Sequence, residues 1–376
     1  MLLKGINLTL MIGPGVPIPV SKDVLDALTS VEVTSNTEGP SGFSLQFKVN
    51  KNSPLLTLFL LAGGAQIPLV RVVIYVTINA SPQVLIDGVM TNHQMAPGSG
   101  AQNPTLTIIG EDLTRVMDYI DFTGIPYPAM PPEARILIIL AKYAIFGVIP
   151  MVIPSIMLDV PIPIDRIPIQ HGTDLAYVRK LADDVGYSFF IKPGPSPGTS
   201  VAYWGPDIKV GVPQPALNMD MDAQTNVDSL SFTYNSNAGT LPLVYIQEQY
   251  SKVPILIPIP DITPLNPPLG AIPPLPTQFP IMDGTANLSP IQAILIGLAK
   301  AAKKADAVSA TGTLDVLRYG SILQARGLVG VRGAGSPFDG LYYVKSVKHE
   351  IKRGEYKQNF TLTRNGLLST VPQVPA

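Results

Sequence analysis

Three histidines and two pairs of adjacent acids are the first residues of this chain whose types could do chemistry. His93, His171 and His349 lie far apart and have no helical partner spacing. They are interpreted as structural, with a metal site assembled in three dimensions as the alternative. Glu111–Asp112 and Asp183–Asp184 could each supply a general acid and base. The first pair precedes a predicted helix, where acids are favoured, and the second falls on a solvated helix face, so both are predicted to be structural.

Two further patterns resemble ligand sites but lack their defining residues. Asp220 and Asp222, followed by Asn226 and Asp228, are spaced loosely like a calcium loop, but the sixth-position glycine and the terminal glutamate are absent, which favours a turn. The glycines of residues 327–335 lack a Gly-Lys-Ser/Thr ending and are predicted to serve bends between strands. We therefore predict no catalytic, cofactor-binding or metal-binding residue, no cofactor, and a protein that is not an enzyme.

Composition limits the kinds of partner. The 376 residues carry a net charge of −1 and only 14% are charged, so no positive field attracts nucleic acid and no nucleic-acid recognition is predicted. With 46% hydrophobic residues, large subunit interfaces are the simplest explanation. The length predicts two or more domains. The absence of cysteine excludes disulfides and thiolate chemistry, and fits either a cytosolic location or changing redox conditions. The N-terminal segment lacks the apolar region of a signal peptide.

An apolar stretch over residues 136–153 raises the question of a membrane span. It contains Lys142, and Pro150 and Pro154 interrupt its far end. Pro132 and Glu133 are typical of a helix start. The pattern favours a buried helix over residues 132–147, followed by an extended segment, over a transmembrane helix.

Short strands flank this helix on both sides. Alternating or continuously apolar runs separated by turn residues predict a small antiparallel barrel or sandwich first, then a small α/β unit whose helix begins at Thr173 or Asp174 and ends at Gly186. The proline-rich residues 254–280 predict an ordered, extended arm on a neighbouring surface, and an amphipathic helix is expected after Ser289. The predicted strands cover residues 43–49, 71–79, 83–91, 105–110, 187–192, 200–204, 229–234 and 243–249, and several from 328 onward.

The last long strand pair, residues 341–364, is predicted to form a half-buried antiparallel hairpin. Gly354 can supply the positive φ of its turn. In the return strand Tyr356, Phe360 and Leu362 share one face with Gln358, and polar or basic residues occupy the other. We expect four lysines of the hairpin to face a lumen, an adjoining ring or a neighbouring subunit: Lys345, Lys348, Lys352 and Lys357.

The order of these elements resembles the phage late control D family, the hub proteins of contractile tails and related injection systems, whose fold VgrG-type hubs share. Three segments carry the likeness. Residues 86–91 look like the strand that closes the family's first tube barrel, and residues 174–190 look like its helix–Gly–strand element. Residues 317–320 followed by 340–349 look like its C-terminal signature.

The resemblance implies an α+β, mostly β fold with two tube-type antiparallel β-barrel modules, an intervening buried helix and a small α/β unit. The expected domains are a first tube-like barrel (1–115), a buried helical connector (116–158), the α/β unit (159–214) and a second tube-like barrel (215–376) with a proline-rich insertion (about 254–285).

The function implied is that of a structural baseplate hub of a contractile phage tail or contractile injection system. Three chains would form a pseudo-sixfold ring that joins a hexameric inner tube to a trimeric spike. Expected partners are two further copies, an inner tube protein, a separate spike protein, and baseplate wedge or LysM-type baseplate proteins. Assembly is expected in the cytoplasm, followed by residence in the baseplate of a tail-like particle. A tail-associated peptidoglycan or glycan hydrolase using Glu111 and Asp112, and a receptor-binding tail protein, are the alternatives.

Overall fold

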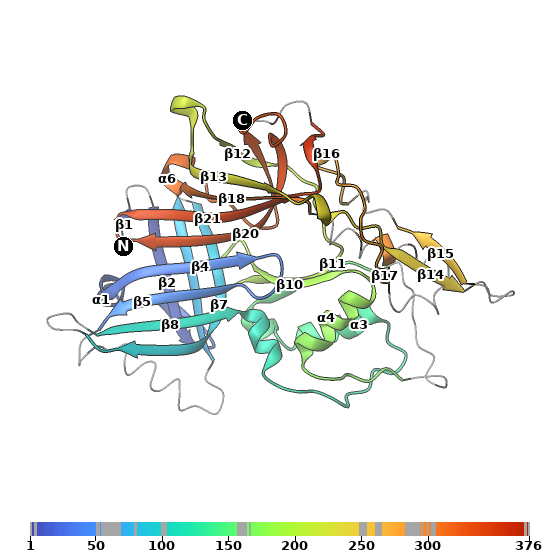
Figure 1. Ribbon diagram of the computed structural model, residues 1–376. Helices are drawn as coiled ribbons and strands as arrows, with labels where there is room; N and C mark the ends of the chain where they lie inside the picture. The colour runs from blue at the N-terminus through green and yellow to red at the C-terminus, as the bar shows by residue number, and fades with distance from the viewer. Residues whose placement is uncertain are drawn as a thin grey trace.

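The protein, seen in a computed structural model, is built mostly of β-strands around two main cores (Figure 1). The mostly-β, α+β class expected from the sequence is therefore confirmed. The structure describes residues 2–3, 6–49, 69–78, 81–98, 104–155, 167–247, 254–259, 265–282 and 306–371, with the additional positions 53, 164, 294, 296–298, 301 and 374.

A 14-stranded sheet forms the body of the molecule. Its order is β1-β2-β6-β7-β8-β5-β4-β20-β21-β18-β13, with β3 beside β2 and with β19 joining β12 to β20. The strands form because apolar and polar residues alternate, as in β5, where Phe43, Leu45 and Phe47 are buried and the residues between them are not. The strand bounds are β1 Leu2–Leu3, β2 Ile6–Pro14, β3 Ile18–Pro19, β4 Leu28–Asn36, β5 Gly42–Lys48, β6 Val70–Ile78, β7 Ser81–Ala96, β8 Thr105–Asp112, β12 Gln214–Asn218, β13 Val227–Tyr234, β18 Val308–Asp315, β19 Leu328–Arg332, β20 Gly340–Lys352 and β21 Glu355–Arg364.

The first and last parts of the chain meet in this sheet. β4 and β20 pair antiparallel over seven consecutive positions, from Ser346 opposite Asn36 to Lys352 opposite Ser30. The buried residues of both parts belong to one hydrophobic cluster. The two β modules are therefore continuous with each other. Over the described residues the strand path runs from β1 to β13 without a pairing that closes it, so closure into barrels stays a prediction.

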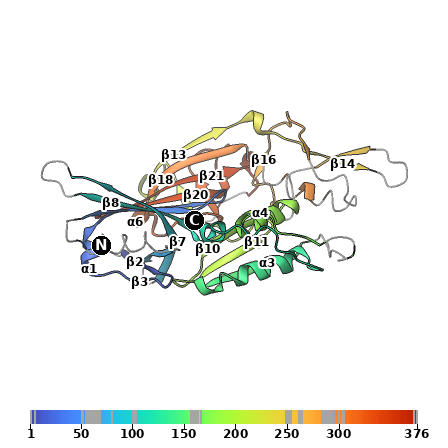
Figure 2. The same cartoon turned by 90° about the horizontal axis from the view of Figure 1, so that it is seen from below.

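A small α/β unit packs beside the sheet (Figure 2). Its three strands have the order β10-β11-β9, with β11 antiparallel to β10 and parallel to β9. Trp204 is fully buried in its core. The bounds are η1 Leu113–Asp118, α3 Pro132–Ala141, η2 Ala144–Phe146, β9 Val148–Val152, α4 Asp174–Asp184, β10 Ser188–Pro193 and β11 Ser200–Gly205.

The helix that the sequence pattern predicted as buried is shorter than expected and only partly buried, since Leu137 and Ile138 are exposed. α3 ends at Ala141, where a helix through residue 147 was expected. A short 3-10 turn follows and ends at Gly147, whose φ of 69° is the left-handed conformation that stops a helix. At the break the Lys142 ammonium lies 2.6 Å from the Asp174 carboxylate and over the Phe122 ring. No helix of the described residues is long and apolar enough to cross a membrane.

The proline-rich region is partly sheet. β14 (Leu243–Gln247) pairs with β15 (Pro254–Pro258) and β17 (Ile281–Met282), and β16 (Gly270–Ile272) pairs with β22 (Leu367–Ser369). The predicted helix after Ser289 lies mostly outside the described residues, but positions 294, 296–298 and 301 are helical. The Pro-rich stretch 159–168 lies mostly outside them too. The remaining elements are α1 Lys22–Ala27, α6 Val316–Tyr319, η3 Asp222–Gln224 and η4 Ser236–Ala238.

Candidate functional site

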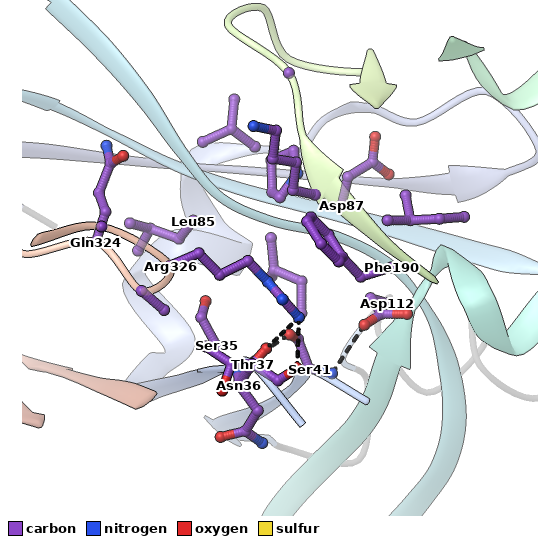
Figure 3. A pocket seen from close by; sticks show the side chains of 18 of the residues that line it. Ser35, Asn36, Thr37, Ser41, Leu85, Asp87, Asp112, Phe190, Gln324 and Arg326 are labelled. Carbon is purple, nitrogen blue, oxygen red and sulfur yellow. Dashed lines mark hydrogen bonds between the residues drawn. The ribbon is translucent and has the colours of Figure 1, made fainter. Parts of the chain in front are cut away.

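A cleft of about 810 Å³ lies between the sheet and the α/β unit (Figure 3). Its walls are the end of β4, the first part of β7 (residues 82–87), strand β10 of the α/β unit and the loop that leads into β19. The residues that line it include Asp87, Asp112, Arg179, Phe190, Lys192 and Arg326.

Arg326 crosses the cleft from the loop before β19. Its Nη2 donates to the backbone carbonyls of Asn36 (3.0 Å) and Thr37 (2.9 Å), at the end of β4. Its guanidinium carbon lies 3.5 Å from the centroid of the Phe190 ring, which belongs to β10. Burial lowers the pKa of Arg326 from its ordinary value. Because the pKa of an arginine begins so high, the side chain remains a cation that links the main sheet to the α/β unit.

Asp87 lies at another wall of the cleft, inside an otherwise apolar run of β7. Arg71 of β6 donates two hydrogen bonds to the Asp87 carboxylate, from Nε to Oδ1 at 2.8 Å and from Nη2 to Oδ2 at 2.6 Å. The Ser200 hydroxyl lies 3.3 Å from the same carboxylate. Burial raises the pKa of Asp87, and the contacts with Arg71 act in the opposite direction. This carboxylate is occupied by structural contacts.

The adjacent acids Glu111 and Asp112 have different surroundings. The pair precedes a helix, as the sequence predicted, and Asp112 caps this 3-10 helix, η1, by accepting from the Thr114 amide (2.9 Å). Its other oxygen accepts from the Ser41 amide at 2.8 Å. Burial raises the pKa of Asp112. Glu111 is half-buried in β8, opposite Gly42 and Val89. Asp112 is thus held by amide donors, as a helix cap is.

The other predicted candidates are dispersed. Asp183 and Asp184 lie on the exposed face of α4, as expected. His93 and His171 are exposed, whereas His349 is buried with its Nδ1 2.8 Å from the Tyr356 hydroxyl. Burial lowers the pKa of His349 to about 4. Within the described ranges no three His, Asp or Glu side chains gather as a metal would require.

The acidic and glycine-rich segments form turns. Asp220 and Asp222 have φ values of 48° and 49° beside the short 3-10 helix η3. Gly333 and Gly335 follow β19 with φ of 86° and 90°, a conformation that glycine adopts without strain. Gly330 lies inside β19, and a Cβ there would overlap the Val374 side chain. Asp220, Asp222, Gly333 and Gly335 therefore agree with the interpretation as turns and bends, whereas Gly330 is a strand residue at a close approach.

Three of the four lysines predicted on the closing hairpin, all except Lys352, form ion pairs among the described residues. The Lys345 ammonium lies 3.1 Å from Glu38, and that of Lys348 lies 3.0 Å from both Glu32 and Glu350. Lys357 lies 3.3 Å from Glu355 and 3.6 Å from Asp228. The hairpin otherwise has the predicted form, since Gly354 has a φ of 82° and Gln358 is fully buried with Tyr356.

Sequence reasoning missed the residues that matter most in the cleft, which are Arg71, Asp87 and Arg326. The sequence pattern around Arg71 and Asp87 could have identified both. A single charge within each of two continuously apolar strands, which must be buried on both faces, requires a partner of opposite sign. Arg326 follows no such pattern, and only the fold brings it beside β4 and β10.

The fold is shared with tail and secretion-system proteins. It is similar to a tail protein from Neisseria meningitidis MC58, with a TM-score of 0.63 and 14% identity over 97% of this chain and 98% of that one. An Escherichia coli component of the type VI secretion system, described as similar to the T4 tail proteins gp27 and gp5, matches with a TM-score of 0.50 and 11% identity (93% of this chain, 76% of that). A chain of the Francisella PdpA–VgrG complex matches with a TM-score of 0.56 and 11% identity (100% and 60%). No family model and no curated protein sequence matches.

Proposed function

We propose that the protein is a structural baseplate component of a contractile tail or contractile injection system. In this role it is a hub: three copies form a ring that joins a hexameric inner tube to a separate trimeric spike. The proposal is supported by a fold shared with phage tail proteins and a type VI secretion component along nearly the whole chain. It also agrees with a cleft whose buried acids serve as an ion-pair partner and a helix cap.

The pairing of β4 with β20 is the observation that carries the proposal. It joins two β modules into one sheet, and that sheet has a polar face that crosses the boundary between them. One in-register row on this face runs across β13, β18, β21, β20 and β4. Its members are Ser231, Thr311, Thr361, Ser346 and Asn36. Small polar side chains suit a wall that faces water rather than a second core.

Symmetry explains why two joined modules would be useful. Three copies with two similar modules each present six near-equivalent sheets, which can stack on a sixfold tube. The same ring keeps threefold symmetry for the spike. A closed ring also covers the edge strands β1 and β13 of each copy, which otherwise present unpaired backbone groups.

The molar mass of the protein in solution tests whether it forms a trimeric hub. Size-exclusion chromatography with light scattering should show a trimer, either alone or when the tube and spike proteins are added. A protein that stays monomeric beside both partners would contradict the proposal.

The lack of cysteine allows a second test of the wall. A single cysteine at Thr361, on the polar face, should react with a small maleimide in the free chain. In the assembled ring it should be protected from a bulky maleimide if this face lines a lumen. A cysteine at the exposed Asp184 of α4 is the matched control. Equal labelling of both positions by the bulky reagent in the assembly would argue against a lumenal wall.

The hydrolase alternative makes a different prediction. It requires lysis of peptidoglycan by the wild-type protein and loss of that activity in Glu111→Gln. A receptor-binding role requires the isolated protein to bind cell surfaces. Activity of either kind would replace the hub as the primary function.

A further inference from the structure

Arg326 is a half-buried cation that has no ion-pair partner among the described residues. Buried charges in proteins are normally paired with an opposite charge. Among the described residues Arg326 makes no ion pair, and one of its nitrogens, Nη2, makes both of its hydrogen bonds, to the carbonyls of Asn36 and Thr37. The stacking on Phe190 fixes the plane of the guanidinium. Nε and Nη1 are therefore available to an acceptor that enters the cleft.

The balance of charge in the cleft points the same way. Arg179, from the half-buried side of α4, and the exposed Lys192 of β10 line the cleft together with Arg326. The structure shows no ion pair for either of them in the described ranges. The two acids of the lining, Asp87 and Asp112, are already held by Arg71 and by backbone amides. The charge of Asp112 acts on Arg179 and Arg326, but three cations line the cleft against this one carboxylate without a cationic partner, so positive charge is in excess.

One wall of the cleft is also the edge of a sheet. β10 is the outermost strand of the order β10-β11-β9, and β11 is its one strand partner in the described part of the chain. Phe189 and Ile191 point into the α/β core, so Phe190 and Lys192 share the opposite face. An edge strand offers alternate backbone N–H and C=O groups to an incoming extended peptide.

We propose that this cleft binds an extended, acidic segment of a partner protein. The segment adds a strand along the edge of β10, and one of its carboxylates binds Arg326, where the planar guanidinium can donate two parallel hydrogen bonds. Arg179 and Lys192 attract the neighbouring acids. A volume of about 810 Å³ admits several residues of such a segment. The inference does not require the hub, because one copy contains the whole cleft.

A designed peptide tests the proposal on the full-length protein. The probe is a fluorescein-labelled hexapeptide of alternating valine and glutamate, and its match is the same peptide with lysine in place of glutamate. Fluorescence anisotropy should show saturable binding of the glutamate peptide alone. Because a charge-assisted hydrogen bond is lost, Arg179→Gln and Arg326→Gln should each weaken binding about tenfold. Lys352→Gln removes the same charge outside the cleft and should change affinity less than about twofold.

Arg326→Gln also breaks contacts to β4, so its fold needs a check. Arg179 makes no such contact among the described residues, which makes Arg179→Gln the decisive variant, and the fluorescence of the single tryptophan, Trp204, monitors the α/β unit in both. Absence of binding up to about 1 mM peptide overturns the proposal. So does equal affinity for the lysine peptide, or an Arg179→Gln variant that binds as well as Lys352→Gln. If Arg179→Gln changes the mass of the particle in light scattering but not peptide affinity, a second copy occupies the cleft and the proposal is also wrong.

Discussion

Arg71 and Asp87 form a bidentate ion pair inside the protein, where both side chains are almost fully buried. The same Arg71 nitrogen, Nη2, also donates to the carbonyls of Phe146 (2.7 Å) and Gly198 (3.0 Å). These two residues belong to the α/β unit, whereas Arg71 and Asp87 belong to the main sheet. The Arg71 guanidinium therefore pairs with the buried Asp87 carboxylate and also connects the main sheet to the α/β unit.

Removing one member of this pair should be costly. Asp87→Asn leaves a buried guanidinium without its counter-charge, and we expect a loss of about 3–5 kcal/mol in the free energy of unfolding. The Trp204 fluorescence transition in a denaturant titration measures the loss in the α/β unit. Glu38→Gln, which breaks the exposed pair with Lys345, is the control and should cost less than about 1 kcal/mol. Similar costs for both variants would mean that the buried pair contributes little.

Gly88, within the β7 segment 86–91, allows β7 to approach β8 closely. A Cβ at Gly88 would lie 2.1 Å from the Glu111 carbonyl oxygen. We expect Gly88→Ala to destabilise the protein by about 1–3 kcal/mol through overpacking. Gly354→Ala has open space but a φ of 82°, so it should cost about 1–2 kcal/mol from backbone strain alone.

Pairing each glycine variant with a serine variant separates these two causes. A larger side chain should worsen the effect at Gly88 and leave the effect at Gly354 unchanged. Thermal denaturation followed by circular dichroism provides the comparison, and a size-independent effect at Gly88 would contradict the close-approach explanation.

His349 should make stability depend on pH. Burial lowers its pKa from 6.5 to about 4, so between these values the unfolded chain binds a proton that the folded protein excludes. The contribution is complete above about pH 6.5 and is lost as the pH falls toward 4, by about 3 kcal/mol in all. Urea titrations from pH 7.5 to 4.5 should show this decline. His349→Gln should flatten the decline, and an equal slope in wild type and variant would exclude His349 as its source.

The lysines of the closing hairpin should contribute little to stability. Lys348 lies between Glu32 and Glu350, and hydrogen bonds to these carboxylates raise its pKa. All three side chains are partly exposed. A double-mutant cycle with Lys348→Met and Glu32→Gln should therefore give a coupling below about 1 kcal/mol that decreases in high salt. A larger coupling that salt does not change would indicate that this face is buried.

Local patterns predicted a large part of the fold. The alternation in β5 and β8, the continuous apolar run in β6, the Thr173 cap of α4 and the Gly354 turn all depend on residues within one element. The strands β2 and β4 were not assigned from the sequence. β4 mixes Ser, Thr and Glu with two valines, so its sequence does not predict a strand clearly. Its burial results from pairing with β5 and β20.

The candidate site was less predictable. Asp112 lies in a helix cap, and Asp220, Asp222, Gly333 and Gly335 lie in turns, because these roles depend on near neighbours in the chain. The interpretation of the acids and histidines as structural residues stays a prediction. The lysines of the hairpin show the limit of such reasoning. Their spacing placed them on one face, but the acids that neutralise Lys345 and Lys348 come in part from β4 and the loop that follows it, near the other end of the chain.

The sequence by itself determined the β-rich class, the element order and the scarcity of charge, because side-chain periodicity and capping act over a few residues. The tertiary structure alone decided which distant elements meet. Arg326 donates to Asn36 across 290 residues, and β20 pairs with β4 across a similar separation. Such contacts depend on backbone edges and on burial shared by both partners, which no local pattern encodes. The cleft, the position of Arg326 within it and the continuous sheet all arise from these long-range contacts.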